Sequence, residues 1–384
     1  MFMHPMNRVA AASTTAPTPA PTPEAPSVPT PRQIGARGRI DVVVVGATGY
    51  AGGEAVRWLA SHPAVRLVGA VSRTHDGVPL EGAQPHLARA GLTLTQDIPA
   101  ADAVFLALPH GTAATLVPEL LAAGTTVIDL GPDFRLRDPA DYPRWYGFEH
   151  PAHELLERAV YGLPELHRAE LQGLGTASGA IVAAPGCYPT ATLLALAPLA
   201  RAGLIAEVIV DAKSGVSGAG REARPDLTFA EVNESVRAYG LAGHRHTAEI
   251  EQELIALATT ANAEPPVPLD FVPHLVPMTR GLLATCHVRP SRPVAQEELD
   301  AIYAAAYAGE PFVRVVGEPP ATKHVLASNE ARVHVRVQPR TGRILAMGAI
   351  DNLAKGAASQ AVQAFNLVFG LPETTGLDAL PVAP

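Results

Sequence analysis

Cys187 lies in a setting that suits a nucleophilic thiol. It belongs to the string APGCYPT, residues 184–190, which follows a buried apolar strand and precedes the apolar helix ATLLALAPLA. Pro189 suits the first turn of a helix, so we expect the thiol at a helix N-terminus, where the helix dipole lowers a thiol pKa. Cys286 stands inside the strand-like string GLLATCHV and is typical of a small core residue. The sequence therefore favours Cys187 as the reactive cysteine.

Two histidines are candidates for the proton transfer that a thiol nucleophile needs. His244 and His246 belong to the string GHRHT, directly before the helical string AEIEQELIAL. In an extended segment, side chains two residues apart point to the same side. A metal-binding pair is the alternative, but no third and fourth ligand stands at suitable spacing, so we expect no metal site. The residues alone place His244 only slightly ahead of His246.

A glycine-rich turn between a strand and a helix predicts a nucleotide site. The string GATGYAG, residues 46–52, follows the β-branched run RIDVVVVG. Glycines in such a turn let a pyrophosphate approach the helix N-terminus. The spacing is GxxGxxG rather than GxGxxG, and a structural turn is the alternative, but the strand–turn–helix order favours the nucleotide.

The end of the second strand indicates which nucleotide would bind. An NAD-binding domain usually places a carboxylate there for the ribose hydroxyls. Here the strand ends in Ser72 and Arg73, and the first carboxylate is Asp76. A hydroxyl and a guanidinium suit a 2′-phosphate, which arginine holds with two hydrogen bonds. We therefore predict NADP(H), with a solvated loop arginine as the alternative.

A second loop of small residues, SGVSGAGR at residues 214–221, follows a predicted strand. Its backbone amides could approach a flat ring or a phosphate closely. A flexible loop explains the same residues equally well, so the string alone leaves both interpretations open.

The elements that would position these residues begin with alternating strands and helices. We predict strands at 39–46, 66–71, 102–108 and 126–129, and helices at 52–61 and 112–123. Such alternation indicates a parallel, doubly wound sheet. The fold class is therefore α/β, with a Rossmann-type dinucleotide-binding domain over residues 38–183. Residues 131–150 are irregular and rich in Pro, Asp and Arg, so we expect them to follow the surface near a site.

A second, α+β domain is predicted over residues 184–351. After the helix that begins near Pro189, strand-like segments occur at 207–213, 270–276, 281–288, 312–316 and 332–338. Most of them alternate apolar and polar residues, which is typical of a mixed or antiparallel sheet. A final helix is expected at 354–369. Residues 1–37 are rich in Pro, Thr and Ala and are predicted to be a disordered tail.

Composition excludes several classes of function. The chain has 384 residues, 47% hydrophobic and 17% charged, with a formal net charge of −8. An acidic chain without a long Lys/Arg run argues against nucleic-acid binding. No apolar run is long enough to span a membrane, the first residues lack the apolar stretch of a secretory signal, and two cysteines are too few for a disulfide framework. We therefore expect a cytoplasmic protein that acts on a small molecule.

Eight strings together resemble the N-acetyl-γ-glutamyl-phosphate reductase family, type 1-like, which is related to aspartate-semialdehyde dehydrogenase. They occur in order over nearly all of the chain after the tail. The strings are GATGYAG from Gly46, ALPHG to Gly111, DFRL from Asp133, APGCYPT from Ala184, SGVSGAGR from Ser214, HRHTAEIEQEL from His244, PMTRGLLAT from Pro277 and DNLAKGAASQAVQ from Asp351. The departures are the additional tail and Ala248, where the family often has proline.

The resemblance implies roles for individual residues. Cys187 would be the nucleophile, and the first histidine of HRH, His244, the general acid/base. The cofactor-binding set would be Gly46, Thr48, Gly49, Tyr50, Ala51, Gly52, Ser72, Arg73, Pro109, His110, Ser217, Gly218 and Asn352. Arg135 and Arg221 are candidates for the phosphate and carboxylate of the substrate, because arginine binds both groups with two hydrogen bonds, and surface salt bridges would explain either arginine equally well. His246 is a further candidate for substrate binding. The family also implies that residues 352–384 return to the first domain and that the protein is a homodimer or homotetramer.

The reaction implied is the NADPH-dependent reduction of N-acetyl-γ-glutamyl phosphate to the γ-semialdehyde and phosphate, through a thioester on Cys187, in arginine biosynthesis. A close rival is the same chemistry on aspartyl phosphate or on a carrier-linked aminoadipyl phosphate; the HRHTAEIEQ string speaks against the aspartyl case. A more distant rival is a regulator that senses NADP without catalysis. The presence of both Cys187 and His244 in specific contexts disfavours it.

Overall fold

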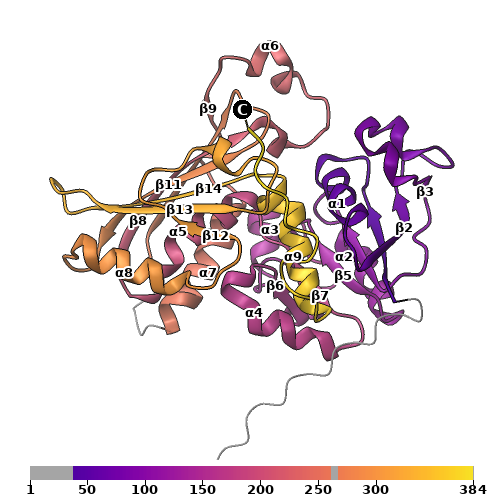
Figure 1. Cartoon of the computed structure of the whole chain (residues 1–384), viewed down its shortest axis with the longest axis horizontal. Coiled ribbons are helices and arrows are strands. Elements are labelled where there is room, and N and C mark those ends of the chain that lie inside the picture. The colour runs from indigo at the N-terminus through magenta and orange to yellow at the C-terminus, as the bar shows by residue number, and fades with distance from the viewer. Residues whose placement is uncertain (1–37, 261–266, 384) are drawn as a thin grey trace, which may run out of the picture.

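The computed structural model describes residues 38–260 and 267–383. The predicted disordered tail, residues 1–37, lies outside the described residues. The described chain forms two domains, each built on its own seven-stranded sheet (Figure 1). Among the described residues, no helix combines the length and apolar character needed to cross a membrane.

The first domain is built on a parallel sheet. Its strands are β1 (Ile40–Val45), β2 (Val65–Val71), β3 (Leu94–Thr95), β4 (Ala103–Leu106), β5 (Thr126–Asp129), β6 (Ala159–Tyr161) and β7 (Ile181–Ala183), in the order β3-β2-β1-β4-β5-β7-β6. The helices are α1 (Tyr50–Ala60), α2 (Ala113–Ala122), α3 (Asp141–Tyr146) and α4 (Pro164–Gly173). β1 is nearly all buried, as its apolar run predicts. The predicted α/β class is confirmed.

The segment after β5 differs from its prediction. Residues 131–136 are buried rather than on the surface, whereas residues 137–140 are exposed as predicted. The polar groups there are satisfied internally: the Asp133 carboxylate accepts the N–H groups of Gly111 (2.8 Å) and Ala114 (3.0 Å) at the start of α2. Charged residues are buried only when they are paired, and the partners of this segment are distant in sequence. The sequence therefore predicts exposure for residues that are in fact buried.

The second domain is built on a mixed sheet in the order β12-β13-β14-β11-β8-β10-β9. Its strands are β8 (Ile205–Gly215), β9 (Arg237–Ala238), β10 (Leu269–Val276), β11 (Leu282–Pro290), β12 (Val313–Val315), β13 (Ala331–Val337) and β14 (Ile344–Ile350). The helices are α5 (Cys187–Arg201), α6 (Phe229–Val232), α7 (His246–Thr260) and α8 (Gln296–Ala306). β8 pairs in parallel with β10, and β12 with β13, so the sheet is mixed.

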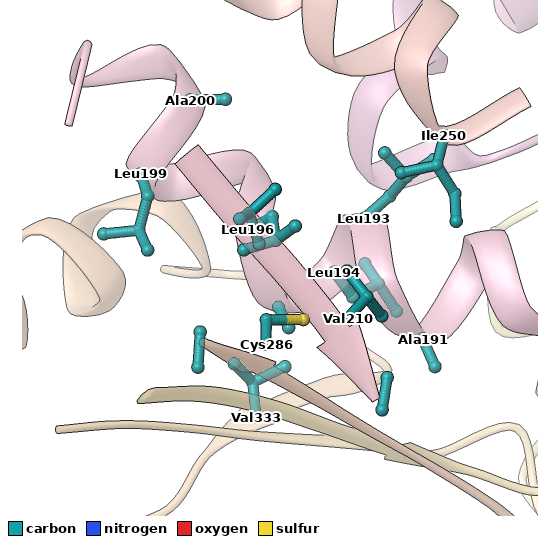
Figure 2. Packing of buried hydrophobic residues seen from close by; sticks show 14 of the residues in the cluster. Ala191, Leu193, Leu194, Leu196, Leu199, Ala200, Val210, Ile250, Cys286 and Val333 are labelled. Atoms are coloured by element: carbon teal, nitrogen blue, oxygen red, sulfur yellow. The ribbon is translucent and has the colours of Figure 1, made fainter. Parts of the chain in front are cut away.

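Helix α5 packs on one face of this sheet and forms the centre of the second core (Figure 2). Leu194 and Leu196 of the helix are fully buried, as are Val210 of β8 and Val333 of β13. Cys286 of β11 is also fully buried, and its sulfur lies among these apolar side chains (Figure 2). The core interpretation of Cys286 therefore agrees with its surroundings. Because α5 is fixed along its length, its first residue, Cys187, is held in place.

The C-terminal helix crosses back to the first domain. β14 is followed by a π-helical turn, Ala354–Ala358, and by α9 (Ser359–Val368). Phe365 of α9 packs against Phe105 of β4, with ring centroids 5.7 Å apart. Helix α9 lies between the two domains (Figure 1), and the turn before it contacts Cys187 at the start of α5.

Candidate active site

Two cavities meet at Cys187. The first, of about 530 Å³, lies over the carboxyl ends of β1, β2, β4 and β5 and extends to the start of α5. The second, of about 640 Å³, lies on the other side of Cys187, between the start of α5 and the segment that leads into α7. Both are lined by Cys187, Gly218, Arg245 and His246. A ligand in one cavity would therefore meet a ligand in the other at this thiol.

The glycine-rich turn shapes the first cavity for a phosphate group. Gly46 has φ +82°, and a Cβ there would clash with the carbonyl oxygen of Ala107. A Cβ on Gly52 would clash with the carbonyl of Gly46. Gly49 stands at the cap position of α1 and gives it no side-chain hydrogen bond. The first N–H groups of α1 therefore remain for an anion such as a pyrophosphate.

The far end of the first cavity offers hydroxyl and guanidinium groups. Ser72 is buried at the end of β2, and its Oγ lies 3.3 Å from Thr74 Oγ1 and 3.4 Å from His75 Nδ1. Arg73 is exposed and lines the cavity beside them. The end of β2 contributes Ser72, Arg73 and Thr74 to the cavity lining, and the carboxylate in the lining, that of Glu222, comes from the loop after β8. This chemistry fits a 2′-phosphate better than a ribose diol.

The other predicted cofactor residues line the same cavity. Pro109 and His110 follow β4, Ser217 and Gly218 follow β8, and Asn352 follows β14. All of the cofactor-binding residues predicted from the sequence therefore border one cavity, although they come from both domains.

Cys187 is the first residue of α5, with Gly186 at the cap position. The expected lowering of its pKa is wrong. Burial raises the pKa of the Cys187 thiol to about 11, against the lowering effects of Arg135 and of the Tyr188 backbone N–H. Protein atoms crowd this helix N-terminus, so desolvation of the thiolate outweighs the favourable charges.

Arg135 lies beneath the loop that carries Cys187. Its Nε donates to the carbonyl of Ala184 (2.8 Å) and its Nη2 to the carbonyl of Leu130 (2.9 Å), while Nη1 lies 3.5 Å from Glu249 Oε2. The same glutamate accepts the backbone N–H of Gly186 at 2.8 Å. Arg135 and Glu249 therefore fix the loop from below, and only the remaining N–H groups of Arg135 are left for a ligand.

His244 and His246 both border Cys187, but in different ways. His244 lines the second cavity, whereas His246 lines both. His246 is buried, its Nδ1 has no hydrogen-bond partner among the described residues, and a Cβ on Gly186 would lie 2.6 Å from its Nε2. Burial, reinforced by Arg245, lowers the pKa of His244 to about 4, and burial lowers that of His246 as well. Both rings are therefore neutral near pH 7.

The tautomer of His244 follows from one contact. Its Nδ1 accepts the backbone N–H of His246 at 3.2 Å. A ring nitrogen that accepts a hydrogen bond carries no proton, so in the neutral ring the proton is on Nε2. His244 is thus fixed as a donor at Nε2, among the rings of Tyr188, Tyr239 and Phe271.

The second cavity contains charged residues that sequence reasoning missed. Arg224 and Arg237 line it, and both form ion pairs with Asp226, at 2.7 and 3.0 Å. Arg245 lines both cavities. Arg224 and Arg237 lie outside every quoted string, so nothing local marked them, whereas Arg245 stands between the two predicted histidines.

Arg221, a predicted substrate residue, lies on the side of the first cavity. Its Nη1 donates to the carbonyl of Thr48 at 2.7 Å and its Nη2 to that of Ala83 at 2.9 Å. It lines the first cavity and is not among the residues that line the second. Its position therefore links the glycine-rich turn of the first domain with the loop after β8.

Comparisons with known proteins agree with this architecture. One family model, described as semialdehyde dehydrogenase, NAD binding domain, matches residues 41–174. A second, described as semialdehyde dehydrogenase, dimerisation domain, matches residues 187–352. Among solved structures, aspartate semialdehyde dehydrogenase II from Vibrio cholerae is similar, with a TM-score of 0.65 and 17% identity over 86% of this chain and 98% of that one. At this identity the likeness shows the fold alone.

Sequence relatives are much closer. The N-acetyl-gamma-glutamyl-phosphate reductase of Symbiobacterium thermophilum is 50% identical over 90% of this chain and 99% of its own length. The protein of the same name from Moorella thermoacetica is 47% identical over 89% of this chain and 99% of its own. That from Halorhodospira halophila is 49% identical over 90% and 100%.

Proposed function

The chain belongs to the N-acetyl-γ-glutamyl-phosphate reductase family, and from this premise we propose that it reduces N-acetyl-γ-glutamyl phosphate to the γ-semialdehyde with release of phosphate. The reaction is a step of arginine biosynthesis. One observation carries the proposal: Cys187 stands where a cavity suited to a dinucleotide meets a second cavity lined by arginines and histidines. A covalent thioester at this point would be open to both ligands.

Cys187 acts as the nucleophile in this proposal. Its sulfur attacks the acyl carbon, and the bond from that carbon to the phosphate oxygen breaks, so that phosphate leaves with the electron pair. The thiol must first lose its proton, and a pKa of about 11 makes that costly. Arg135 lowers that cost through its charge, and His246, neutral and adjacent to Gly186, is placed to accept the proton.

The first cavity is proposed to hold NADP(H), with the pyrophosphate at the N-terminus of α1 and the 2′-phosphate at Ser72 and Arg73. When bound, NADPH supplies the hydride that reduces the thioester. His244 Nε2–H donates a hydrogen bond to the carbonyl oxygen and stabilises the negative charge that develops there as the thioester carbon is reduced. The oxyanion then re-forms the carbonyl as the carbon–sulfur bond breaks and the Cys187 thiolate leaves.

The substrate's charges require cationic partners in or near the second cavity. We propose Arg245 for the acyl phosphate, because it lines both cavities at the thiol. Arg135 remains a candidate for the departing phosphate through its place beside Cys187. Arg224 and Arg237 suit the α-carboxylate, and His246 borders the same space. Arg221, which bonds to the glycine-rich turn, is better suited to closing over the nucleotide than to holding the substrate.

We also propose how two copies associate. The residues of β8 alternate between buried and half-buried, and the buried set faces α5 and its neighbours. Ile209 of β8, Leu283 of β11 and Met347 of β14 are half-buried on the opposite face. The same face carries Asp211, Lys213 and His274, and it belongs to a domain whose family description is a dimerisation domain, so it suits a homodimer. Both cysteines are free, which suits the cytoplasm.

The reverse reaction tests the proposed function. Purified protein is given N-acetylglutamate γ-semialdehyde, phosphate and NADP⁺, and formation of NADPH is followed. Aspartate semialdehyde and NAD⁺ serve as parallel controls. A phosphate-dependent rate with the acetylated substrate and NADP⁺ is expected. If NADP⁺ binds and no rate appears, the protein is a sensor or uses a carrier-linked substrate.

A further inference from the structure

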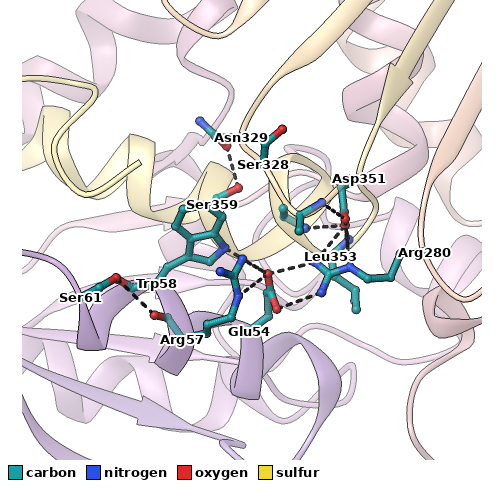
Figure 3. Close-up of polar contacts among 12 residues, drawn as sticks. Glu54, Arg57, Trp58, Ser61, Arg280, Ser328, Asn329, Asp351, Leu353 and Ser359 are labelled. Atoms are coloured by element: carbon teal, nitrogen blue, oxygen red, sulfur yellow. Dashed lines mark hydrogen bonds and ion pairs between the residues drawn. The ribbon is translucent and has the colours of Figure 1, made fainter. Parts of the chain in front are cut away.

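A cluster of charged side chains joins the two domains (Figure 3). Arg280, in the turn between β10 and β11, donates to two carboxylates at once. Its Nε lies 2.9 Å from Asp351 Oδ2, and its Nη2 lies 2.9 Å from Glu54 Oε1. Glu54 belongs to α1 of the first domain, whereas Asp351 directly follows β14 of the second. Neither cavity is lined by any of these three residues, so a role in the reaction must act through other groups.

The Glu54 side of the cluster holds the helix whose N-terminus faces the first cavity. Glu54 is 6% exposed and also accepts hydrogen bonds from Arg57 (2.6 Å) and from Trp58 Nε1 (3.1 Å). Burial alone would raise the pKa of Glu54, but the hydrogen bonds from Arg57 and Arg280 lower it to about 2. The carboxylate is therefore charged at any pH of interest, and it fixes α1 to Arg280.

The Asp351 side holds the element that packs on the nucleophile. Asp351 Oδ1 accepts the backbone N–H groups of Leu353 (2.9 Å) and Ala354 (3.1 Å), which begin the π-helical turn. In that turn Gly356 lies against Cys187, because a Cβ on Gly356 would be 2.8 Å from the Cβ of Cys187. Asp351 therefore sets where the turn meets the thiol.

The residues next to Arg280 and Asp351 extend the cluster into the first cavity. The backbone N–H of Gly281 donates to Asn352 Oδ1 at 2.8 Å, and Asn352 Nδ2 donates to Ser217 Oγ at 3.0 Å. Asn352 and Ser217 both line the first cavity. One arginine thus connects α1, the wall of the cavity and the turn against Cys187.

We propose that Arg280, through Glu54 and Asp351, is a positioning residue that sets the distance between a nucleotide held by α1 and the acyl group held by Cys187. The inference rests on the proposed function. Hydride transfer requires reacting atoms about 3–3.5 Å apart, and a displacement of about 1 Å can cost about 10²-fold in rate. The first domain holds one reactant and the second domain the other, so a contact that ties α1 to the turn against Cys187 bears directly on this distance.

The test compares Arg280→Lys with Arg57→Lys. Arg57 binds the same Glu54 carboxylate but belongs to the same helix, so its change leaves the connection between the domains intact. Alkylation of Cys187 by iodoacetamide is measured with and without saturating NADP⁺, together with the NADP⁺ dissociation constant. We expect NADP⁺ to protect Cys187 in the wild type and in Arg57→Lys. Arg280→Lys should bind NADP⁺ with unchanged affinity and lose most of the protection.

A second measurement addresses the chemistry. In single turnovers of the reverse reaction, Arg280→Lys should form NADPH about 10²-fold more slowly, with a larger primary deuterium isotope effect from the deuterated aldehyde. Equal protection in all three proteins, or equal losses in both variants, would overturn the positioning role. If Arg280→Lys does not fold, Glu54→Gln, which keeps the volume and loses the charge, replaces it. A wild type that shows no turnover refutes the proposed function, whereas the protection experiment still decides the role of Arg280.

Discussion

The two cavities on either side of Cys187 are built in different ways. The first is lined largely by backbone and small residues at the ends of parallel strands, among them Gly46, Gly49 and Gly52. The second is formed by large and charged side chains, among them Trp145, Tyr239, Arg224 and Arg237. A dinucleotide is bound mainly through backbone amides and close approach, whereas a small anionic substrate is selected by side chains.

This difference has a testable consequence, because only a few residues border both cavities. Changes confined to one cavity should alter the affinity for one ligand. Changes at the shared border, of which Cys187 and His246 are part, should alter the reaction of both. The predictions below test that division, from the largest expected effect to the smallest.

Replacement of the shared thiol should have the largest effect. Cys187→Ser is expected to lower kcat by more than about 10³-fold, the scale on which loss of a nucleophile acts, because a serine hydroxyl is a poor leaving group and a weak nucleophile. NADPH binding, measured by fluorescence titration, should be unchanged, since the first cavity keeps its glycine-rich turn. Cys286→Ala is the matched control and should keep kcat. Retained turnover in Cys187→Ser would rule out the covalent route.

His244 should have the next largest effect. His244→Asn removes the donor at Nε2 and is expected to lower kcat by about 10²–10³-fold, the usual cost of losing a hydrogen-bond donor to a developing oxyanion. His246→Asn serves as the comparison and should lower kcat less, with a rise in KM for the semialdehyde. Steady-state kinetics of the reverse reaction measures both. The opposite order of effects would make His246, and not His244, the hydrogen-bond donor to the carbonyl oxygen.

The pH dependence of thiol reactivity tests the pKa of Cys187 at the border of the two cavities. A thiol reacts as its thiolate, so a pKa of about 11 in place of the ordinary 9.0 leaves about 10²-fold less thiolate at pH 8. Iodoacetamide should therefore modify Cys187 slowly at pH 8 without nucleotide, and the rate should rise as pH approaches 11. Cys187→Ser gives the background rate, since Cys286 is fully buried. A plateau near pH 8 would instead support the dipole-lowered pKa that the sequence predicts.

The sequence predicts the first cavity better than the second. The turn at residues 46–52 and the strand before it form one continuous string, and Ser72 and Arg73 are neighbours at the end of the next strand. The cofactor residues inferred from these strings and from the family all border one cavity. Arg224 and Arg237 are brought to the second cavity by an excursion between β8 and α7 that has little regular structure. No local pattern marks such residues, because their role depends on distant chain segments.

Burial explains the remaining differences between sequence and structure. A thiol at a helix N-terminus is expected to be acidic, but the crowding around Cys187 comes from Gly356 and other distant residues. Likewise, Asp133 and Arg135 are expected from the sequence to be surface residues. In the structure Asp133 accepts the N–H of Gly111, and Arg135 binds the carbonyl of Ala184 and the carboxylate of Glu249. These partners allow both side chains to be buried. In both cases the decisive contacts are far apart in sequence.

The smallest predicted effect separates the ligands of the two cavities. Arg73→Ala should raise the KM for NADPH about 10- to 100-fold, the value of a charge-assisted hydrogen bond to phosphate, because the 2′-phosphate loses its cationic partner. The KM for NADH should change little, since NADH lacks that phosphate, and so should the KM for the acyl substrate. Arg237→Ala, in the second cavity, is the matched control and should show the reverse pattern. If Arg73→Ala raises the KM for NADPH and NADH equally, Arg73 does not read the 2′-phosphate, and nucleotide choice must come from Ser72 and Thr74 instead.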